Sequence, residues 1–244
     1  MTGDWPIALF VLLAGPAVGS FLGVVVDRVA DGRSLWSRSA CEACGARLGA
    51  LDLVPILSSV RGRCRHCGVE IPGHLLRLEI AALAASAIAV ALATGPATML
   101  ALAAFLWCLV GLFYADLLHF RLPNVLTAAL FVAGLALAAV TPGRSVPEAL
   151  ATAAAGVLVF WLLRIGYRRL RGRDGLGLGD VKMMAGLGAG LGPEALPLAV
   201  LAAAVLALLV AVVEGWRGGA GLNPQARVPF GAWLSGGAVL ALLL

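Results

Sequence analysis

Residues 80–115 read IAALAASAIAVALATGPATMLALAAFLWCLVGLFYA and contain no Asp, Glu, Lys or Arg. A helix needs about 20 mostly apolar residues to cross the hydrocarbon core of a bilayer. The run is long enough for two such helices, and Thr94-Gly95-Pro96 supplies a tight turn between them. This stretch therefore predicts a helical hairpin that crosses a membrane twice.

The composition of the whole chain agrees with a membrane protein. Of its 244 residues, 61% are hydrophobic and 13% are charged, whereas soluble domains carry about 25% charged residues. This composition excludes a soluble globular enzyme, a disordered chain and a nucleic-acid-binding domain. The lipid bilayer is the predicted partner, and no nucleic acid is expected.

Similar apolar segments recur along the chain. They cover residues 5–26, 122–143, 149–163, 181–192, 195–213 and 228–244, in addition to the two helices within 80–115. We therefore predict an all-α polytopic membrane protein with about eight transmembrane helices. Residues 1–26 form the first helix, residues 27–79 a polar cytoplasmic module, and residues 80–244 a seven-helix membrane core.

The basic residues indicate the orientation of these helices. If the N-terminus is extracytoplasmic, Arg144 is the single residue among the 18 Lys and Arg that falls on the outer side. Lys and Arg concentrate in cytoplasmic loops. Because eight spans return the chain to its starting side, both termini are predicted to be extracytoplasmic.

The polar module contains two CxxC pairs. Four of the five cysteines form them, namely Cys41, Cys44, Cys64 and Cys67. Two such pairs can surround one tetrahedral Zn²⁺ with four thiolates. Gly45 and Gly68 suit the tight turn that follows each pair. Disulfides or redox pairs are the alternative, but the reducing side of the membrane disfavours them. We predict a structural zinc site and interpret Cys108, alone in a span, as a packing residue.

Two acidic residues lie at the ends of predicted spans. Asp116 ends the third span, and Asp180 begins the sixth after Gly177 and Gly179. Acids at membrane depth are costly and are therefore functional candidates. Two facing carboxylates that share a proton can hydrolyse an amide, one activating water and the other protonating the leaving amine. The alternative is that each Asp caps a helix, with Lys182 as a counter-charge for Asp180.

Glycines alternate on both sides of Asp180. They occupy positions 175, 177 and 179 before it and positions 186, 188, 190 and 192 after it. Glycine permits unwound backbone, so we expect a poorly helical segment beside the catalytic water. Tight helix packing is the alternative explanation.

A basic run follows the fifth span. It comprises Arg164, Arg168, Arg169, Arg171 and Arg173. We interpret it as an anchor at the lipid headgroups. The alternative is that the run favours the ionised form of the nearby Asp180.

Taken in order, these motifs resemble the type IV prepilin leader peptidases, which are membrane aspartyl proteases of the GxGD type. The resemblance covers most of the chain. It includes Gly19-Ser20-Phe21-Leu22, the two cysteine pairs, Asp52-Leu53-Val54-Pro55, Glu79, Asp116 with Leu122-Pro123-Asn124, Gly177-Leu178-Gly179-Asp180-Val181-Lys182 and Val228-Pro229-Phe230-Gly231.

The resemblance implies an enzyme of the bacterial inner membrane that cuts the basic leader from prepilins or pseudopilins at the cytoplasmic face. It implies that Asp116 and Asp180 are the catalytic pair, with Gly177, Gly179, Lys182 and Glu79 in support. Many members also methylate the new N-terminus with S-adenosylmethionine. Acidic residues that suit a basic leader are Glu42, Asp52, Glu70, Glu79 and Asp174.

The chain also departs from the family pattern. Gly23 stands where the family often has Asn, Ser37 where it has Pro, and His74-Leu75-Leu76 where Arg-Tyr-Pro is common. These positions lie in or beside the region that the resemblance links to methylation. The rival hypothesis is a non-enzymatic transporter or assembly scaffold with a structural zinc site. A transporter needs polar groups near the bilayer midplane, and the predicted spans contain very few polar residues.

Overall fold

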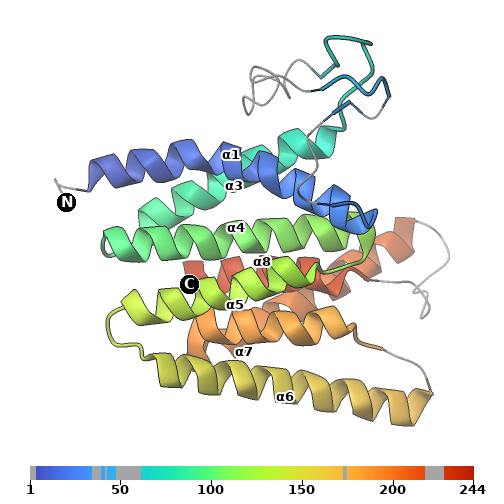
Figure 1. The fold of residues 1–244 in the computed structure, drawn as a ribbon. Coiled ribbons are helices and arrows are strands. Elements are labelled where there is room, and N and C mark those ends of the chain that lie inside the picture. The colour runs from blue at the N-terminus through green and yellow to red at the C-terminus, as the bar shows by residue number, and fades with distance from the viewer. Residues whose placement is uncertain (1–3, 35–39, 42, 48–61, 173–174, 218–227) are drawn as a thin grey trace. The chain divides into compact units, whose positions relative to one another are not determined.

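The computed structural model describes residues 4–34, 40–41, 43–47, 62–172, 175–217 and 228–244. Its helices are α1 (Trp5–Ala30), α3 (Gly73–Leu92), α4 (Pro96–His119), α5 (Asn124–Val140), α6 (Val146–Arg171), α7 (Leu178–Arg217) and α8 (Phe230–Leu243), shown in Figure 1. Within the described ranges, the remaining backbone pairing is two isolated antiparallel bridges. The predicted all-α class is confirmed.

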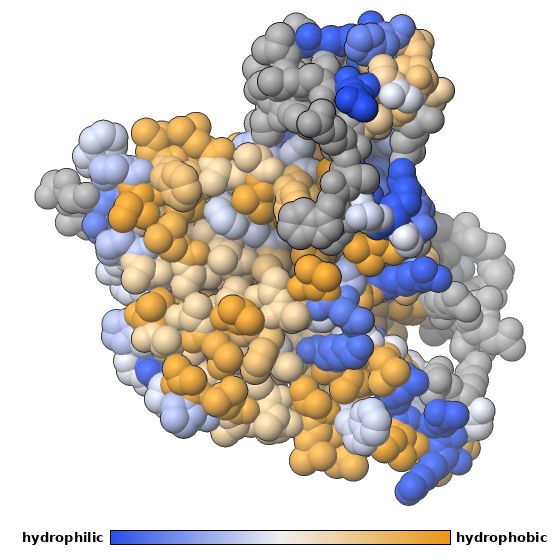
Figure 2. All heavy atoms as spheres, in the orientation of Figure 1, coloured by the Kyte–Doolittle hydropathy of each residue, from blue (hydrophilic) through white to orange (hydrophobic). Residues whose placement is uncertain are grey.

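Several of these helices have the length and composition of membrane spans. Among the described residues, α1, α3, α4, α6 and α7 are long and apolar enough to cross a bilayer, and α5 and α8 are shorter apolar helices. Figure 2 shows largely apolar side chains along the flanks of the helices and hydrophilic ones gathered near helix ends. The chain is therefore a membrane protein.

The predicted sixth and seventh spans are the two halves of α7. They are separated by Gly192, whose backbone has φ 80° and ψ 178°. A positive φ of this size favours glycine, and Pro193 directly after it lacks the N–H that would continue the helical bonding. The first half is thus continuous over residues 178–191, and the bend lies at Gly192.

Arg144 stabilises the end of the first half of α7. Its guanidinium donates hydrogen bonds to the carbonyl oxygens of Gly190 and Ala189, the latter at 2.8 Å. The last carbonyls of a helix have no partner within the helix, and a cation at this end is favoured by the helix dipole. Arg144, the basic residue assigned to the outer side, therefore holds the bend in place.

We expect Arg144→Ala to lower the free energy of unfolding by about 2 kcal/mol, because hydrogen bonds to charged groups contribute about 1.5–3 kcal/mol. For a chain of this size the melting midpoint in detergent should fall by about 4–8 °C. Arg169→Ala, at an exposed position of α6, is the control and should leave the midpoint nearly unchanged. Equal midpoints for the two variants would contradict the role of Arg144.

The structure divides into two compact units, residues 1–111 and 112–244. In the first unit, α1 packs on α3 through glycines at every fourth position of α1. A Cβ at Gly19 would lie 2.6 Å from the Cα of Glu79, and one at Gly15 would lie 2.5 Å from the Ser86 hydroxyl. The Trp107 indole of α4 donates a 3.0 Å hydrogen bond to the same Ser86 hydroxyl. The two compact units are defined by contacts between helices. The predicted boundary at residue 79 was instead placed where the polar segment ends.

In the second unit, α5, α6 and α8 each pack against α7. The glycines of α7 allow this close approach. A Cβ at Gly188 would lie 2.7 Å from the Cα of Ala153 in α6, and one at Gly186 would lie 2.6 Å from Leu130 in α5. The expected poorly helical segment after Asp180 is therefore wrong, and tight packing is the better explanation. Intact helical bonding is favoured there because lipid offers no substitute hydrogen bonds.

Candidate active site

Asp116 lies in the last turns of α4 and is only 7% exposed. Its Oδ2 accepts a 3.0 Å hydrogen bond from the backbone N–H of Ala232, in the first turn of α8. The first N–H groups of a helix lack partners within it, and the helix dipole favours an anion at that end. The N-terminus of α8 therefore holds the carboxyl of Asp116. The motif that ends at Gly231 lies beside this contact, but nothing in the sequence predicts that Ala232 binds Asp116.

Asp180 is the third residue of α7 and is 8% exposed. Its Oδ2 accepts a 3.2 Å hydrogen bond from the backbone N–H of Gly177, which directly precedes the helix. A carboxylate that reaches back in this way is half of a capping box. The capping role weighed for Asp180 is therefore present in the structure. This hydrogen bond uses one oxygen of the Asp180 carboxyl, and the other oxygen can still serve in catalysis.

The second unit brings the two aspartates together. Asp116 and Asp180 are close enough for the charge of one to act on the other. The side chain of Leu122 lies against Gly179 beside one aspartate and against Gly231 beside the other. Two buried acids from helices far apart in sequence thus share one site.

Two cations near Asp180 make other contacts. The Nζ of Lys182 donates a 2.9 Å hydrogen bond to the Oδ1 of Asn124 at the start of α5, and its role as a counter-charge for Asp180, weighed as an alternative, stays a prediction. Lys182 links α7 to α5. Arg164 donates to the carbonyl of Leu176, which attaches the segment before α7 to α6. Arg173 lies outside the described residues, and headgroup anchoring by the arginine run stays a prediction.

Glu79 is a buried acid near the start of α3. It lies in the second turn of α3, is 1% exposed and sits where Gly19 of α1 approaches the α3 backbone. The Glu79 carboxylate is thus buried in this structure, and its supporting role and its contact with a basic leader stay predictions. Glu70 is exposed and lies 3.6 Å from Arg63. Glu42, Asp52 and Asp174 lie outside the described residues.

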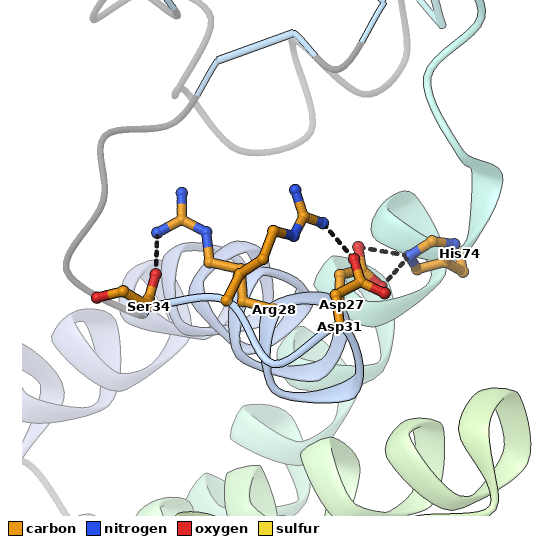
Figure 3. Close-up of polar contacts among 6 residues, drawn as sticks. Asp27, Arg28, Asp31, Ser34 and His74 are labelled. Carbon is orange, nitrogen blue, oxygen red and sulfur yellow. Dashed lines mark hydrogen bonds and ion pairs between the residues drawn. The ribbon is translucent and has the colours of Figure 1, made fainter.

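Residues 23 and 74–76, where the chain differs from the family pattern, lie close together in the first unit. His74 places its Nε2 3.1 Å from both carboxylate oxygens of Asp27, joining the start of α3 to the end of α1 (Figure 3). A Cβ on Gly23 would lie 2.5 Å from a terminal carbon of Leu75. The missing side chain at 23 therefore makes room for the leucine at 75. Ser37 lies outside the described residues.

The four cysteines of the CxxC pairs form one cluster. The sulfur atoms of Cys41, Cys44, Cys64 and Cys67 all lie within 4.8 Å of one another. Gly45 and Gly68 have φ angles of 69° and 72°, as the tight turns of the predicted knuckles require. The N–H groups of Cys44 and Ala43 lower the pKa of the Cys41 thiol to about 7, whereas desolvation and the other three cysteines raise the pKa of the Cys67 thiol to about 12. The cluster therefore fits a tetrahedral zinc ion.

Other residues near the cluster agree with the sequence interpretation. His66 is exposed, and it is its backbone N–H that lies 3.5 Å from the Cys64 sulfur. Cys108 lies in α4 and does not belong to the cluster. The prediction of four clustered cysteines is confirmed, and the packing role of Cys108 stays a prediction.

The chain matches the type IV leader peptidase family over residues 103–212 and the bacterial peptidase A24 N-terminal domain over residues 13–93. A prepilin leader peptidase/N-methyltransferase of Burkholderia pseudomallei (strain 1026b) is 38% identical, over 96% of this chain and 84% of the relative. The chain belongs to the type IV leader peptidase family. The predicted resemblance is thereby confirmed.

Further relatives of this family carry the same name. Prepilin leader peptidase/N-methyltransferases of Aeromonas hydrophila and Dickeya chrysanthemi are each 33% identical, over 98% of this chain and 91% and 93% of the relatives. No solved structure matches the chain. The peptidase match contains Asp116 and Asp180, and the N-terminal match contains the cysteine cluster. Family membership does not favour the transporter or scaffold hypothesis.

Proposed function

We propose that the chain is a membrane aspartyl endopeptidase that removes the basic leader of type IV prepilins or pseudopilins. The names of its relatives support this substrate class. The observation that carries the proposal is the pair of buried acids, Asp116 and Asp180, whose segments meet at Leu122 within one compact unit and whose like charges are near enough to repel each other. Backbone N–H groups hold one oxygen of each carboxyl. We assign the other oxygens to water and substrate.

The proposed chemistry uses one proton shared by the two carboxyls, because like charges this close do not both ionise. The ionised carboxylate takes a proton from water as the water oxygen bonds to the scissile carbonyl carbon. The protonated carboxyl polarises the carbonyl oxygen and then gives its proton to the nitrogen as the C–N bond breaks. The products are a carboxylic acid on the leader and a free amine on the pilin.

This function is tested by reconstituting the purified protein into membranes and measuring whether it cleaves a prepilin. The product N-terminus, read by mass spectrometry, should correspond to removal of the leader. The names of the relatives also support N-methylation of that terminus. Adding S-adenosylmethionine should then increase the product mass by one methyl group. An unprocessed prepilin would refute the peptidase, and a processed but unmethylated product would refute the methyltransferase alone.

We also propose that the site faces the cytoplasm of the bacterial inner membrane, with eight spans and both termini extracytoplasmic. The two halves of α7 and the shorter α5 and α8 supply the spans beyond α1, α3, α4 and α6. Alkaline phosphatase fused after Leu244 should be active, because that enzyme requires the oxidising side for its disulfides. The same reporter fused after Arg171 should be inactive. The reverse pattern would refute this topology.

The cysteine cluster is proposed to bind one structural zinc ion, because four thiolates close the tetrahedral coordination shell. Zinc analysis of the purified protein should give about one equivalent per chain. Cys41→Ser and Cys67→Ser should lose most of this metal, since each removes one of four ligands. Cys108→Ser, the matched control outside the cluster, should retain it. Full zinc content in Cys41→Ser would contradict the site.

A further inference from the structure

Leu122 occupies the space between the two segments that hold the aspartates. A Cβ on Gly179 would lie 2.9 Å from the Cβ of Leu122, and a Cβ on Gly231 would lie 2.9 Å from its Cδ1. Real Cβ atoms do not approach other carbons this closely. The side chain of Leu122 therefore already fills the gap between the backbone at the start of α7 and the backbone at the start of α8.

Both glycines are directly linked to the candidate catalytic carboxyls. Gly179 precedes Asp180, and Gly231 precedes Ala232, whose N–H binds Asp116. A Cβ on Gly231 would also lie 3.2 Å from the Oδ2 of Asp116. One leucine side chain thus separates the backbone at Gly179 from the backbone at Gly231.

The turn between α4 and α5 fixes Leu122 relative to Asp116. Phe120 adopts a left-handed conformation with φ 52°, which is uncommon for a residue with a side chain. Its N–H donates a 2.9 Å hydrogen bond to the carbonyl of Asp116. Pro123 then stands immediately before α5. Because the turn is short and hydrogen-bonded to Asp116 itself, Leu122 has little freedom to move away.

We propose that Leu122 is a positioning residue that sets the separation of the Asp116 and Asp180 carboxyls. The inference rests on the proposed peptidase function. Proton sharing and the placement of one water both depend on that separation. An error of about 1 Å in the placement of catalytic groups can cost about 10²-fold in rate. Leu122 acts only through the two aspartates, so its effect belongs to the chemical step.

Single substitutions give the first test. Leu122→Ala, which deletes the atoms beyond Cβ, should lower kcat for prepilin cleavage by about 10–100-fold and leave KM nearly unchanged. Leu122→Met, which conserves volume, should retain most of the wild-type kcat. Leu137→Ala is the matched control, because it removes a buried leucine from the other end of α5. It should leave kcat per inserted molecule unchanged.

A compensation experiment gives the sharper test. Gly231→Ala should inactivate the enzyme because its new methyl meets the terminal carbons of Leu122, which is confined on its other side by Gly179. Leu122→Ala removes those carbons, so the double variant should be more active than Gly231→Ala. Gly179→Ala should also inactivate the enzyme, but its methyl would lie 2.9 Å from the Cβ of Leu122 as well as 3.0 Å from its Cδ1. Leu122→Ala keeps that Cβ and should give no rescue.

The outcomes separate this inference from the proposed function. Failure of the wild-type protein to cleave prepilin refutes the peptidase itself. If the wild type cleaves, selective rescue of Gly231→Ala with loss of kcat in Leu122→Ala supports the positioning role. An unchanged kcat in Leu122→Ala, rescue of neither glycine variant, or equal rescue of both would overturn it. Each rate is divided by the amount of membrane-inserted protein, so a folding defect does not imitate a catalytic one.

Discussion

Asp116→Asn and Asp180→Asn should each reduce prepilin cleavage by at least about 10³-fold, within the range that general acid–base catalysis contributes. An amide has nearly the shape of a carboxyl but neither takes a proton from water nor delivers one to a leaving amine. The Asn side-chain oxygen still accepts a hydrogen bond, so the contacts to Ala232 and Gly177 survive in the respective variants. The helices that meet at the site should therefore stay assembled.

The measurement is the rate of leader removal in membranes, divided by the amount of inserted protein. Asp31→Asn is a suitable control because Asp31 is an exposed acid paired with Arg33 at 2.6 Å. It should cleave at the wild-type rate. A rate within tenfold of wild type in either Asp116→Asn or Asp180→Asn would refute the proposed acid pair.

Gly188→Ala should destabilise the second unit by about 3 kcal/mol, at the upper end of what overpacking costs. The added methyl would lie 2.7 Å from the Cα of Ala153 and 2.8 Å from the carbonyl oxygen of Thr152. These are backbone atoms of α6, so no side chain can rotate away and the two helices must separate. The melting midpoint in detergent should fall by about 6–12 °C for a chain of this length.

The same change at Gly166 provides the control. Gly166 is also helical, in α6, and a Cβ there would meet nothing within 4 Å. Alanine is a better helix former than glycine by about 1 kcal/mol, so Gly166→Ala should keep or slightly raise the midpoint. A wild-type midpoint in Gly188→Ala would show that this glycine is not needed for packing and would restore the unwinding explanation.

The spacing of residues was enough to predict the helices and the cysteine cluster. Apolar runs predict helices in a membrane because the backbone must satisfy its own hydrogen bonds there. The turn at Thr94-Gly95-Pro96 separates α3 from α4 as expected. Two CxxC pairs predict a four-sulfur cluster because each pair is a local turn. The bend at Gly192 lies where the predicted spans 181–192 and 195–213 meet. The end of α6 was harder to predict, because its last part, from Arg164 to Arg171, is basic rather than apolar.

The glycines show where a local pattern is ambiguous. Alternating glycines are compatible with an unwound segment and with close helix contact, and the sequence does not say which neighbour lies opposite. The structure places Ala153 against Gly188 and Leu130 against Gly186. Lys182 is a similar case, because the sequence does not show that its ammonium contacts Asn124 of α5.

The sequence by itself determined that this is a helical membrane protein with a thiolate cluster and two acids at helix ends, because each of those features is encoded within a few turns of chain. Only the tertiary structure decided what surrounds the acids. The N–H that holds Asp116 belongs to Ala232, 116 residues away, and Leu122 contacts both aspartate-bearing segments. Such contacts depend on how α4, α7 and α8 pack, and packing is set by side-chain shape between helices rather than by any period along one of them.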